Sequence, residues 1–281
     1  MNRVVVIGDA LVDEMRDERG SVDAPGGSAL NVAVGLGILG VPATLLAMIG
    51  DDADGASLRH YAESHGVVVM SSAAPLGTGR AISDRTEGEP TYSFSPAARE
   101  RTLTFSNPML AAITEAPLVA ISGFPFDTPS EFAALRGAVS GHPRLLIDAN
   151  PRAGFLTDRA AFARALEDLA ASAELVKIGD EDARLLYGTS VRDAAARLSS
   201  RFVLATEGSR GATIFGAERA HQAITPDPRP IVDTMGAGDA TFASVIAQRA
   251  RGAQSWSTML ETAMSIAAET IRHPGGTLRL R

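Results

Sequence analysis

The chain has 281 residues, of which 45% are hydrophobic and 21% are charged, and it carries a formal net charge of −7. This acidic balance argues against nucleic acid or an anionic membrane as a partner, and no apolar run approaches the roughly 20 residues that a membrane span needs. The absence of cysteine excludes disulfides, thiol nucleophiles and cysteine-based zinc sites, while the length fits one large α/β domain with an appendage or two modest domains.

The first predicted elements are a strand at Val4–Ile7 and a helix that begins near Ser28. The strand starts so early that it leaves no room for a signal peptide, and we expect a cytoplasmic protein. Residues Gly35–Gly40 match the pattern G-x-G-x-x-G of dinucleotide-binding proteins. They continue a helix instead of opening one after a strand, so we interpret them as a closely packed helix end. This argues against a nicotinamide-dependent oxidoreductase.

Two polar segments interrupt the predicted main sheet. The first is Glu14–Asp23. The second holds two short alternating strands, Gly79–Ser83 and Pro90–Phe94, around a turn at Glu87–Glu89, which is typical of a β-hairpin. We expect these segments, at about residues 14–25 and 78–105, to form a small sheet that acts as a lid over a binding site.

Strands and helices alternate through the rest of the chain. Besides strands at Thr44–Ile49 and Val67–Met70 and a helix at Ser57–His65, the pattern predicts strands at Leu118–Ser122, Leu145–Asp148, Leu175–Ile178, Phe202–Thr206 and Ala212–Phe215. Helices are predicted at Pro129–Val139, Arg159–Ala171, Asp180–Tyr187, Val191–Leu198, Ala237–Arg249 and Ser255–Ile271. Such repetition predicts an α/β fold with a mostly parallel sheet, covered by helices on both faces. Ligands bind such sheets beyond the carboxyl ends of the strands.

A glycine-rich turn precedes the helix at Ala237. Ile231 and Val232 are predicted to end a strand, and the turn Asp233-Thr234-Met235-Gly236-Ala237-Gly238-Asp239 follows. The glycines let the backbone approach a ligand, and the first amides of a helix bind phosphate readily. Asp239 is a carboxylate beside this anion site. It would either accept a proton from an attacking hydroxyl or simply cap the helix.

This turn resembles the Asp-Thr-x-Gly-Ala-Gly-Asp signature of the ribokinase-like (phosphofructokinase-B type) family of carbohydrate kinases. The resemblance runs along nearly the whole chain. It implies a single kinase domain over residues 1–281, with a three-layer α/β/α core and a small β lid. It also implies that Asp239 is the catalytic base and that Gly236, Ala237 and Gly238 surround the transferred phosphoryl group. Gly8–Asp13 and Asp148–Arg152 favour a fructokinase-like or ketodeoxygluconate kinase-like member over a ribokinase or adenosine kinase, with fructokinase the first choice.

The resemblance implies that a set of five residues binds the substrate. Its members are Asp13, Gly26, Gly27, Asn31 and Arg152. Short carboxylates and carboxamides hold vicinal hydroxyls with directional hydrogen bonds, and an arginine can steady a phosphate or an acidic group. Asn31 could instead cap or bridge helices, and Arg152 could instead form a surface salt bridge.

A second implied set binds the nucleotide and its ions. The nucleotide-binding residues are Lys177, Thr206, Gly208, Gly211 and Gly238. Asp182 is expected to contact magnesium through water, although the family usually has glutamate there and asparagine where this chain has Gly179. Asp233 is a candidate ligand for a monovalent cation.

The activity implied by the resemblance is transfer of phosphate from MgATP to a primary hydroxyl of a small carbohydrate, with potassium as a further candidate cofactor. Fructose is the first candidate substrate, and 2-keto-3-deoxygluconate or ribose is the next. The alternatives are a nucleoside kinase and a catalytically impaired sugar-binding regulator on the same fold. The expected partners are sugar and ATP, with neither nucleic acid nor membrane, and a homodimer formed through exposed lid edges.

Overall fold

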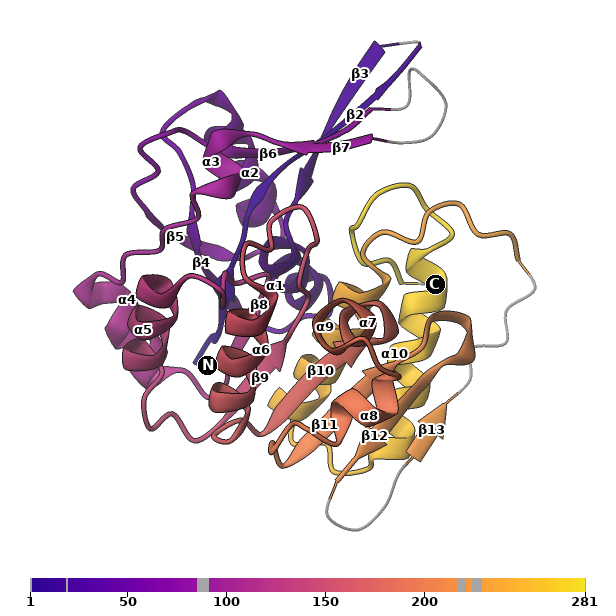
Figure 1. Ribbon diagram of the computed structural model, residues 1–281. Helices are drawn as coiled ribbons and strands as arrows, with labels where there is room; N and C mark the ends of the chain where they lie inside the picture. Colours follow the sequence, from indigo (N-terminus) through magenta and orange to yellow (C-terminus); the bar gives the residue numbers. More distant parts are fainter. Residues whose placement is uncertain (1, 19, 85–90, 217–220, 224–228, 281) are drawn as a thin grey trace.

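The structure is a computed structural model of the chain, and it describes residues 2–18, 20–84, 91–216, 221–223 and 229–280 (Figure 1). The described strands form two sheets, a large one of nine strands and a small one of four. No helix in these ranges is both long enough and apolar enough to cross a membrane.

The large sheet is mostly parallel. Its strands, in spatial order, are β13 (His221–Ala223), β12 (Ala212–Phe215), β11 (Phe202–Thr206), β10 (Leu175–Gly179), β9 (Leu145–Asp148), β8 (Val119–Ser122), β1 (Val4–Gly8), β4 (Ala43–Met48) and β5 (Val68–Ser72). The seven strands from β11 to β5 run parallel to one another, and β12 and β13 add an antiparallel edge. The carboxyl ends of the parallel strands therefore meet along one edge, where ligands bind in such folds.

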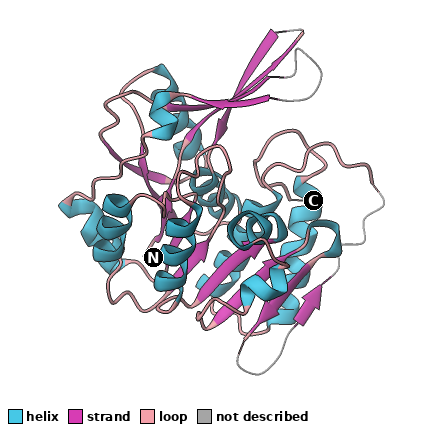
Figure 2. Cartoon of the chain, in the orientation of Figure 1, coloured by secondary structure: helices cyan, strands magenta, loops and turns pink. Residues whose placement is uncertain are grey.

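Helices cover both faces of this sheet (Figure 2). The described α-helices are α1 (Ser28–Ile38), α2 (Ala53–Ser64), α3 (Pro96–Arg99), α4 (Asn107–Glu115), α5 (Pro129–Ala138), α6 (Arg159–Ala170), α7 (Asp180–Tyr187), α8 (Val191–Ala195), α9 (Ala237–Ala250) and α10 (Trp256–Thr270). Helices α1, α2, α9 and α10 contribute to one buried hydrophobic cluster, and α4 to α8 contribute to the other.

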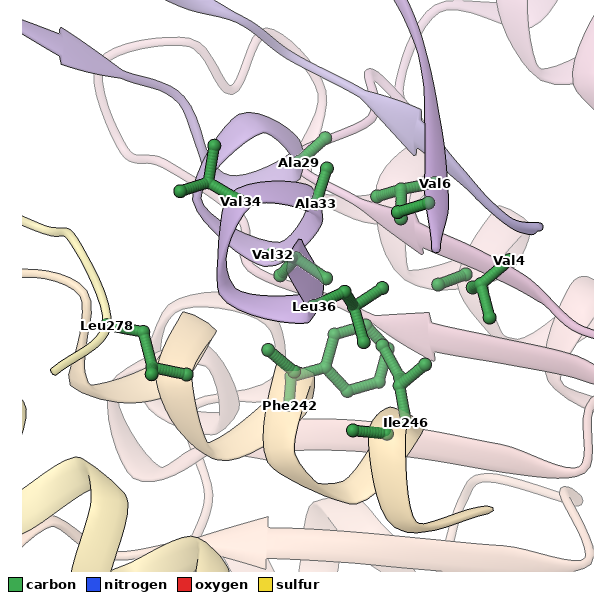
Figure 3. Close-up of a cluster of buried hydrophobic side chains, with 14 of the residues drawn as sticks. Val4, Val6, Ala29, Val32, Ala33, Val34, Leu36, Phe242, Ile246 and Leu278 are labelled. Carbon is green, nitrogen blue, oxygen red and sulfur yellow. The ribbon is translucent and has the colours of Figure 1, made fainter. Parts of the chain in front are cut away.

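The strand side chains alternate between these two clusters. In β1, Val4 and Val6 enter the first cluster, and Val5 and Ile7 enter the second. A strand that is apolar on both sides must be covered on both sides, which explains the three layers. Figure 3 shows the first cluster, where Phe242 of α9 lies beside Leu36 of α1. This packing holds α1 against α9.

The small sheet projects from one end of the molecule (Figure 1). Its order is β3 (Gly20–Gly26), β2 (Leu11–Asp17), β6 (Gly79–Asp84) and β7 (Thr91–Phe94), and only the central pair, β2 and β6, is parallel. Arg80 ties the sheet to α2, because its Nε and Nη2 donate to Asp54 at 2.6 and 2.7 Å. Its Nη1 also donates to Glu14 of β2 at 3.0 Å. The small sheet is thus anchored at its base.

The predicted fold class is confirmed, although several elements differ from expectation. Ile231 and Val232 do not end a strand: their side chains are 59% and 58% exposed, and Val232 N donates to Ile271 O at 2.9 Å. Helix α2 begins at Ala53, earlier than predicted, because Asp52 accepts the Gly55 amide at 2.7 Å and caps it. Helix α8 ends at Ala195, earlier than predicted, and α3, α4 and β13 were not predicted. The turn predicted at Glu87–Glu89 lies outside the described residues.

Candidate active site

Asp239 lies in the first turn of α9, where the chain turns sharply into the helix. Gly236 precedes the helix with φ +75°, and a Cβ at this position would overlap Gly276 O, so only glycine fits. Asp239 is 5% exposed. Its carboxylate accepts hydrogen bonds from α1, with Ser28 Oγ at Oδ1 and Asn31 Nδ2 at Oδ2, the latter at 2.9 Å. The carboxylate is therefore held by side chains of another helix, not by the amides of α9 that a capping role would require.

Ser28 is the centre of a buried polar network. Its Oγ lies 2.7 Å from Ser122 Oγ at the end of β8 and accepts a hydrogen bond from Asn150 Nδ2 at 2.5 Å. Because the single Ser28 proton goes to Asp239, the Ser122 hydroxyl must donate to Ser28. Asn150 has φ +34°, which is uncommon for a residue other than glycine. Three elements thus converge to orient one oxygen of Asp239.

The substrate-binding residues predicted at the start of α1 come together with Asp13. A Cβ at Gly26 would overlap the Asp13 carboxylate, and a Cβ at Gly27 would lie 2.8 Å from the Asp9 carbonyl oxygen. Burial raises the pKa of Asp13 to about 6, with the neighbouring charge of Asp9 adding to the effect and Arg152 opposing it. These residues therefore form a compact acidic surface next to Asn31.

Arg152 lies in the loop after β9, and its side chain faces this acidic surface. Partial desolvation lowers the pKa of Arg152, but the carboxylates of Asp239 and Asp9 outweigh that effect and the pKa is raised. Its guanidinium forms no hydrogen bond or ion pair with another described residue. The surface salt bridge considered from the sequence is therefore absent from the described ranges, and the donors of Arg152 remain available.

Lys177 projects from the middle of β10 toward the first turn of α9. Its Nζ donates to both oxygens of Asp148 on the neighbouring strand at 2.9 Å, and both side chains are buried. A Cβ at Gly238 would lie 3.2 Å from this Nζ. Burial raises the pKa of Asp148 to about 7, and the ammonium group of Lys177 opposes this shift. The ion pair therefore places a buried positive charge directly behind the amides of α9.

The nucleotide-binding candidates downstream lie at the ends of β10 and β11. Thr206 ends β11, and the turn after it is closed by the Glu207 amide, which donates to Gly211 O at 2.8 Å. The Asp182 carboxylate accepts the Gly179 amide at 2.7 Å and so caps α7. A Cβ at Gly179 would lie 3.2 Å from Asp182 Oδ2 and 3.5 Å from Thr206 Oγ1. Gly179, Asp182 and Thr206 are therefore neighbours.

The sequence that forms this site is matched by a family model. The model described as pfkB family carbohydrate kinase matches residues 1–280. The chain belongs to the pfkB family of carbohydrate kinases. The family prediction from the sequence is thereby confirmed, and the protein is a sugar or nucleoside kinase of that family.

Individual pfkB-family relatives differ in the substrates that their names state. The chain is 31% identical to a fructokinase of Klebsiella pneumoniae over 87% of this chain and 83% of the relative. It is 30% identical to an aminoimidazole riboside kinase of Salmonella typhimurium over 85% of this chain and 78% of that protein. A ribokinase of Arabidopsis thaliana solved with ribose and ATP superposes with a TM-score of 0.81 at 22% identity, covering 98% and 94% of the two chains. At this identity the superposition shows the fold.

Asp233 of this pfkB-family kinase links two loops. Its Oδ1 accepts the Met235 amide and its Oδ2 accepts the Gly275 amide, each at 3.0 Å. Within the described ranges, no group of three or more His, Cys, Asp or Glu side chains could hold a metal ion. Asp182 and Asp233 therefore belong to no such group within these ranges.

Sequence reasoning missed two members of the candidate active site, Ser28 and Ser122. Both side chains are buried; the Ser28 hydroxyl donates to the Asp239 carboxylate, and the Ser122 hydroxyl contacts Ser28. Serine is common at helix starts and strand ends, so neither position stood out. The available signal was that Ser28 directly follows Gly26 and Gly27, and that Ser122 ends a strand on the edge where ligands bind.

Proposed function

We propose that this kinase transfers the γ-phosphate of MgATP to a primary hydroxyl of a small carbohydrate, with fructose the first candidate and 2-keto-3-deoxygluconate or ribose the next. The observation that carries the proposal is the buried Asp239 carboxylate, which Ser28 and Asn31 hold at the start of α9. A fixed carboxylate beside free helix amides suits proton abstraction next to a phosphoryl group.

The chemistry assigned to α9 has two parts. Asp239 accepts the proton of the substrate hydroxyl as its oxygen attacks the γ-phosphorus in line. The amides of Gly238 and Asp239, which have no hydrogen-bond partner among the described residues, stabilise the negative charge of the transition state. The Ala237 amide makes a long hydrogen bond of 3.4 Å to Thr234 O and can be redirected to the phosphate.

Cationic groups near α9 would support the nucleotide phosphates. Lys177 contributes a charge behind Gly238, and Arg152 has unused donors that can reach a phosphate or an acidic group. Thr206, Gly208 and Gly211 form the turn assigned to the nucleotide. Magnesium, bound mainly by the phosphates with water contact to Asp182, would neutralise the phosphate charge.

On the sugar side, Asp13, Gly26, Gly27 and Asn31 would position the hydroxyls, and the small sheet would act as the lid that keeps water from the phosphoryl group. The likeness to an aminoimidazole riboside kinase favours a nucleoside kinase as the alternative to a sugar kinase. Both substrates present a primary hydroxyl, so the same base serves either.

The affinity for sugar should weaken as the solution becomes more acidic than about pH 6. The pKa of Asp13 is raised to about 6 by burial and by Asp9, so Asp13 loses its charge below this pH. A neutral carboxyl accepts hydrogen bonds from hydroxyls less strongly than a carboxylate does. We expect kcat/KM for sugar to fall on this acid side with a midpoint near pH 6. In Asp13→Asn this fall in kcat/KM at acid pH should disappear. An unchanged fall would contradict the assignment of Asp13 to sugar binding.

The proposal is tested by measuring ADP release from MgATP with fructose, ribose, 2-keto-3-deoxygluconate, tagatose and nucleosides, with and without potassium. Turnover of one compound supports the kinase and names its substrate. Sugar binding without any turnover would favour the sugar-binding regulator. Loss of turnover without potassium would support Asp233 as part of a monovalent-cation site.

We also propose a homodimer that forms through the small sheet. Strands β3 and β7 are its edges, and Val22 on β3 is 63% exposed. An open strand edge with an exposed apolar side chain favours pairing with a second copy. Val22→Lys should shift the protein to the monomer in size-exclusion chromatography, and a wild-type monomer would refute the dimer. A cytoplasmic location remains a prediction of the cysteine-free sequence.

A further inference from the structure

A cavity lies below the small sheet, next to the candidate active site. It is bounded by the ends of β1 and β8, by the start of β6 and by the segment around and after α3. Most of the residues that line it contribute backbone or apolar side chains. Two lining residues carry a charge, and these are Asp9 and Arg101.

Asp9 is held rigidly at the base of the cavity, and only one of its oxygens is engaged. Oδ1 accepts the Ala29 amide of α1 at 3.1 Å, and Oδ2 has no hydrogen-bond partner among the described residues. Gly123 packs so closely that a Cβ there would overlap the carboxylate. Burial raises the pKa of Asp9, while the charges of Arg101 and Arg152 oppose the shift. Asp9 therefore presents an acceptor whose position is fixed.

Arg101 is fixed from two sides. Its Nη1 donates to Gly123 O at 3.0 Å, and its guanidinium carbon lies 4.5 Å from the centre of the Phe155 ring. Its Nε is closed off from solvent and has no hydrogen-bond partner. Burial lowers the pKa of Arg101, and the charge of Asp9 opposes this. The Arg101 guanidinium therefore has an N–H group that donates no hydrogen bond. A buried donor without an acceptor destabilises the protein, so binding of an acceptor here would be favourable.

Asp9 and Arg101 influence each other electrostatically, but they form no ion pair within the described ranges. We infer that Asp9 and Arg101 form a specificity pair, that is, two side chains that together hydrogen-bond one hydroxyl of a neutral sugar. This hydroxyl is not the one that is phosphorylated. This inference rests on the proposed function and narrows its substrate class to neutral sugars over sugar acids.

The chemistry of the pair selects a hydroxyl. A hydroxyl both donates and accepts hydrogen bonds, so it can donate to Asp9 Oδ2 and accept from the Arg101 guanidinium. An ionised carboxylate, as in 2-keto-3-deoxygluconate, has no proton to donate and would be repelled by Asp9. An apolar group would leave both charged groups desolvated and unpaired.

The test compares kinetic constants of purified full-length variants with fructose and 2-keto-3-deoxygluconate. Asp9→Asn keeps the shape of the side chain and an acceptor for the Ala29 amide, and Arg101→Met removes the donors. Each should raise KM for the neutral sugar about tenfold or more, while kcat at saturating sugar and KM for MgATP stay within about threefold. Asp9→Asn should also reduce the preference for the neutral sugar over the sugar acid, which a purely structural role would not do.

Arg99→Met is the matched control. Arg99 lies two residues away, is exposed, and does not line the cavity. Its variant should keep the wild-type KM for sugar. If Arg101→Met does not fold, Asp9→Asn alone decides, because its hydrogen bond to α1 is retained.

Two results would overturn the inference while leaving the kinase intact: unchanged KM for the neutral sugar in Asp9→Asn, or a wild-type preference for the sugar acid. Absence of turnover and of calorimetric binding with every sugar would refute the proposed function and the specificity pair together. Turnover or sugar binding by the wild-type protein therefore shows whether the proposed function has failed or only the specificity pair.

Discussion

Asp239→Asn should lower kcat by about 10²- to 10⁴-fold, the usual contribution of a positioned general base. Asparagine has nearly the same shape as aspartate, but its amide cannot accept the substrate proton at neutral pH. Ser28 can still donate to the side-chain carbonyl at position 239, and Asn31 can rotate its amide to accept from the new NH2 group. KM for sugar and the thermal midpoint should therefore change little.

The measurement is steady-state ADP release, with sugar binding followed by calorimetry. Ser28→Ala is a useful comparison, because it leaves the base in place and removes one of the two side-chain hydrogen bonds that orient it. It should lose less activity than Asp239→Asn, again mainly in kcat. Turnover of Asp239→Asn within tenfold of the wild type would refute the assignment of the base.

Most of the fold could be predicted because short stretches of sequence determine its strands, helices and turns. A strand such as Val4–Gly8 is apolar on both sides, and the glycine turn before α9 contains both its φ requirement and the amides that are proposed to bind phosphate. Ile231 and Val232 show the limit of this reasoning. Their β-branched side chains favour a strand, yet they pair with no described strand and the segment stays exposed. Tertiary context overrides such propensity.

The connections of the candidate site were less predictable, because they join residues far apart in the sequence. Ser28 meets Asp239 across 211 positions and Ser122 across 94. No local pattern indicates that one serine hydroxyl meets this carboxylate and that a second serine hydroxyl supports the first. Likewise, the pairing of Lys177 with Asp148 follows from the register of β9 and β10, which depends on the assembled sheet.

Lys177→Met should lower the free energy of unfolding by about 3–5 kcal/mol at pH 8, because it breaks a buried ion pair and leaves the Asp148 carboxylate uncompensated. The effect should be smaller at pH 6. Burial raises the pKa of Asp148 to about 7 even with Lys177 present, and loss of the ammonium group raises it further.

The sign of the pH dependence follows from proton binding. In the folded variant Asp148 holds its proton more tightly than in the unfolded chain, where its pKa is near 3.8. The unfolding free energy of the variant therefore falls as the pH rises above 3.8, and it keeps falling above about pH 7, where that of the wild type levels off. Urea unfolding of both proteins between pH 6 and 8 measures this difference.

The double variant Asp148→Asn/Lys177→Met separates the structural role of Lys177 from its predicted role at the nucleotide. With both charges removed, no unpaired ion is buried, and stability should return most of the way toward the wild type. The charge behind Gly238 stays absent, so KM for MgATP should remain raised by about tenfold or more in the double variant. A wild-type KM for MgATP in the restabilised protein would mean that Lys177 only supports the sheet. An unfolding free energy of Lys177→Met within about 1 kcal/mol of the wild type at pH 8 would contradict the ion-pair argument itself.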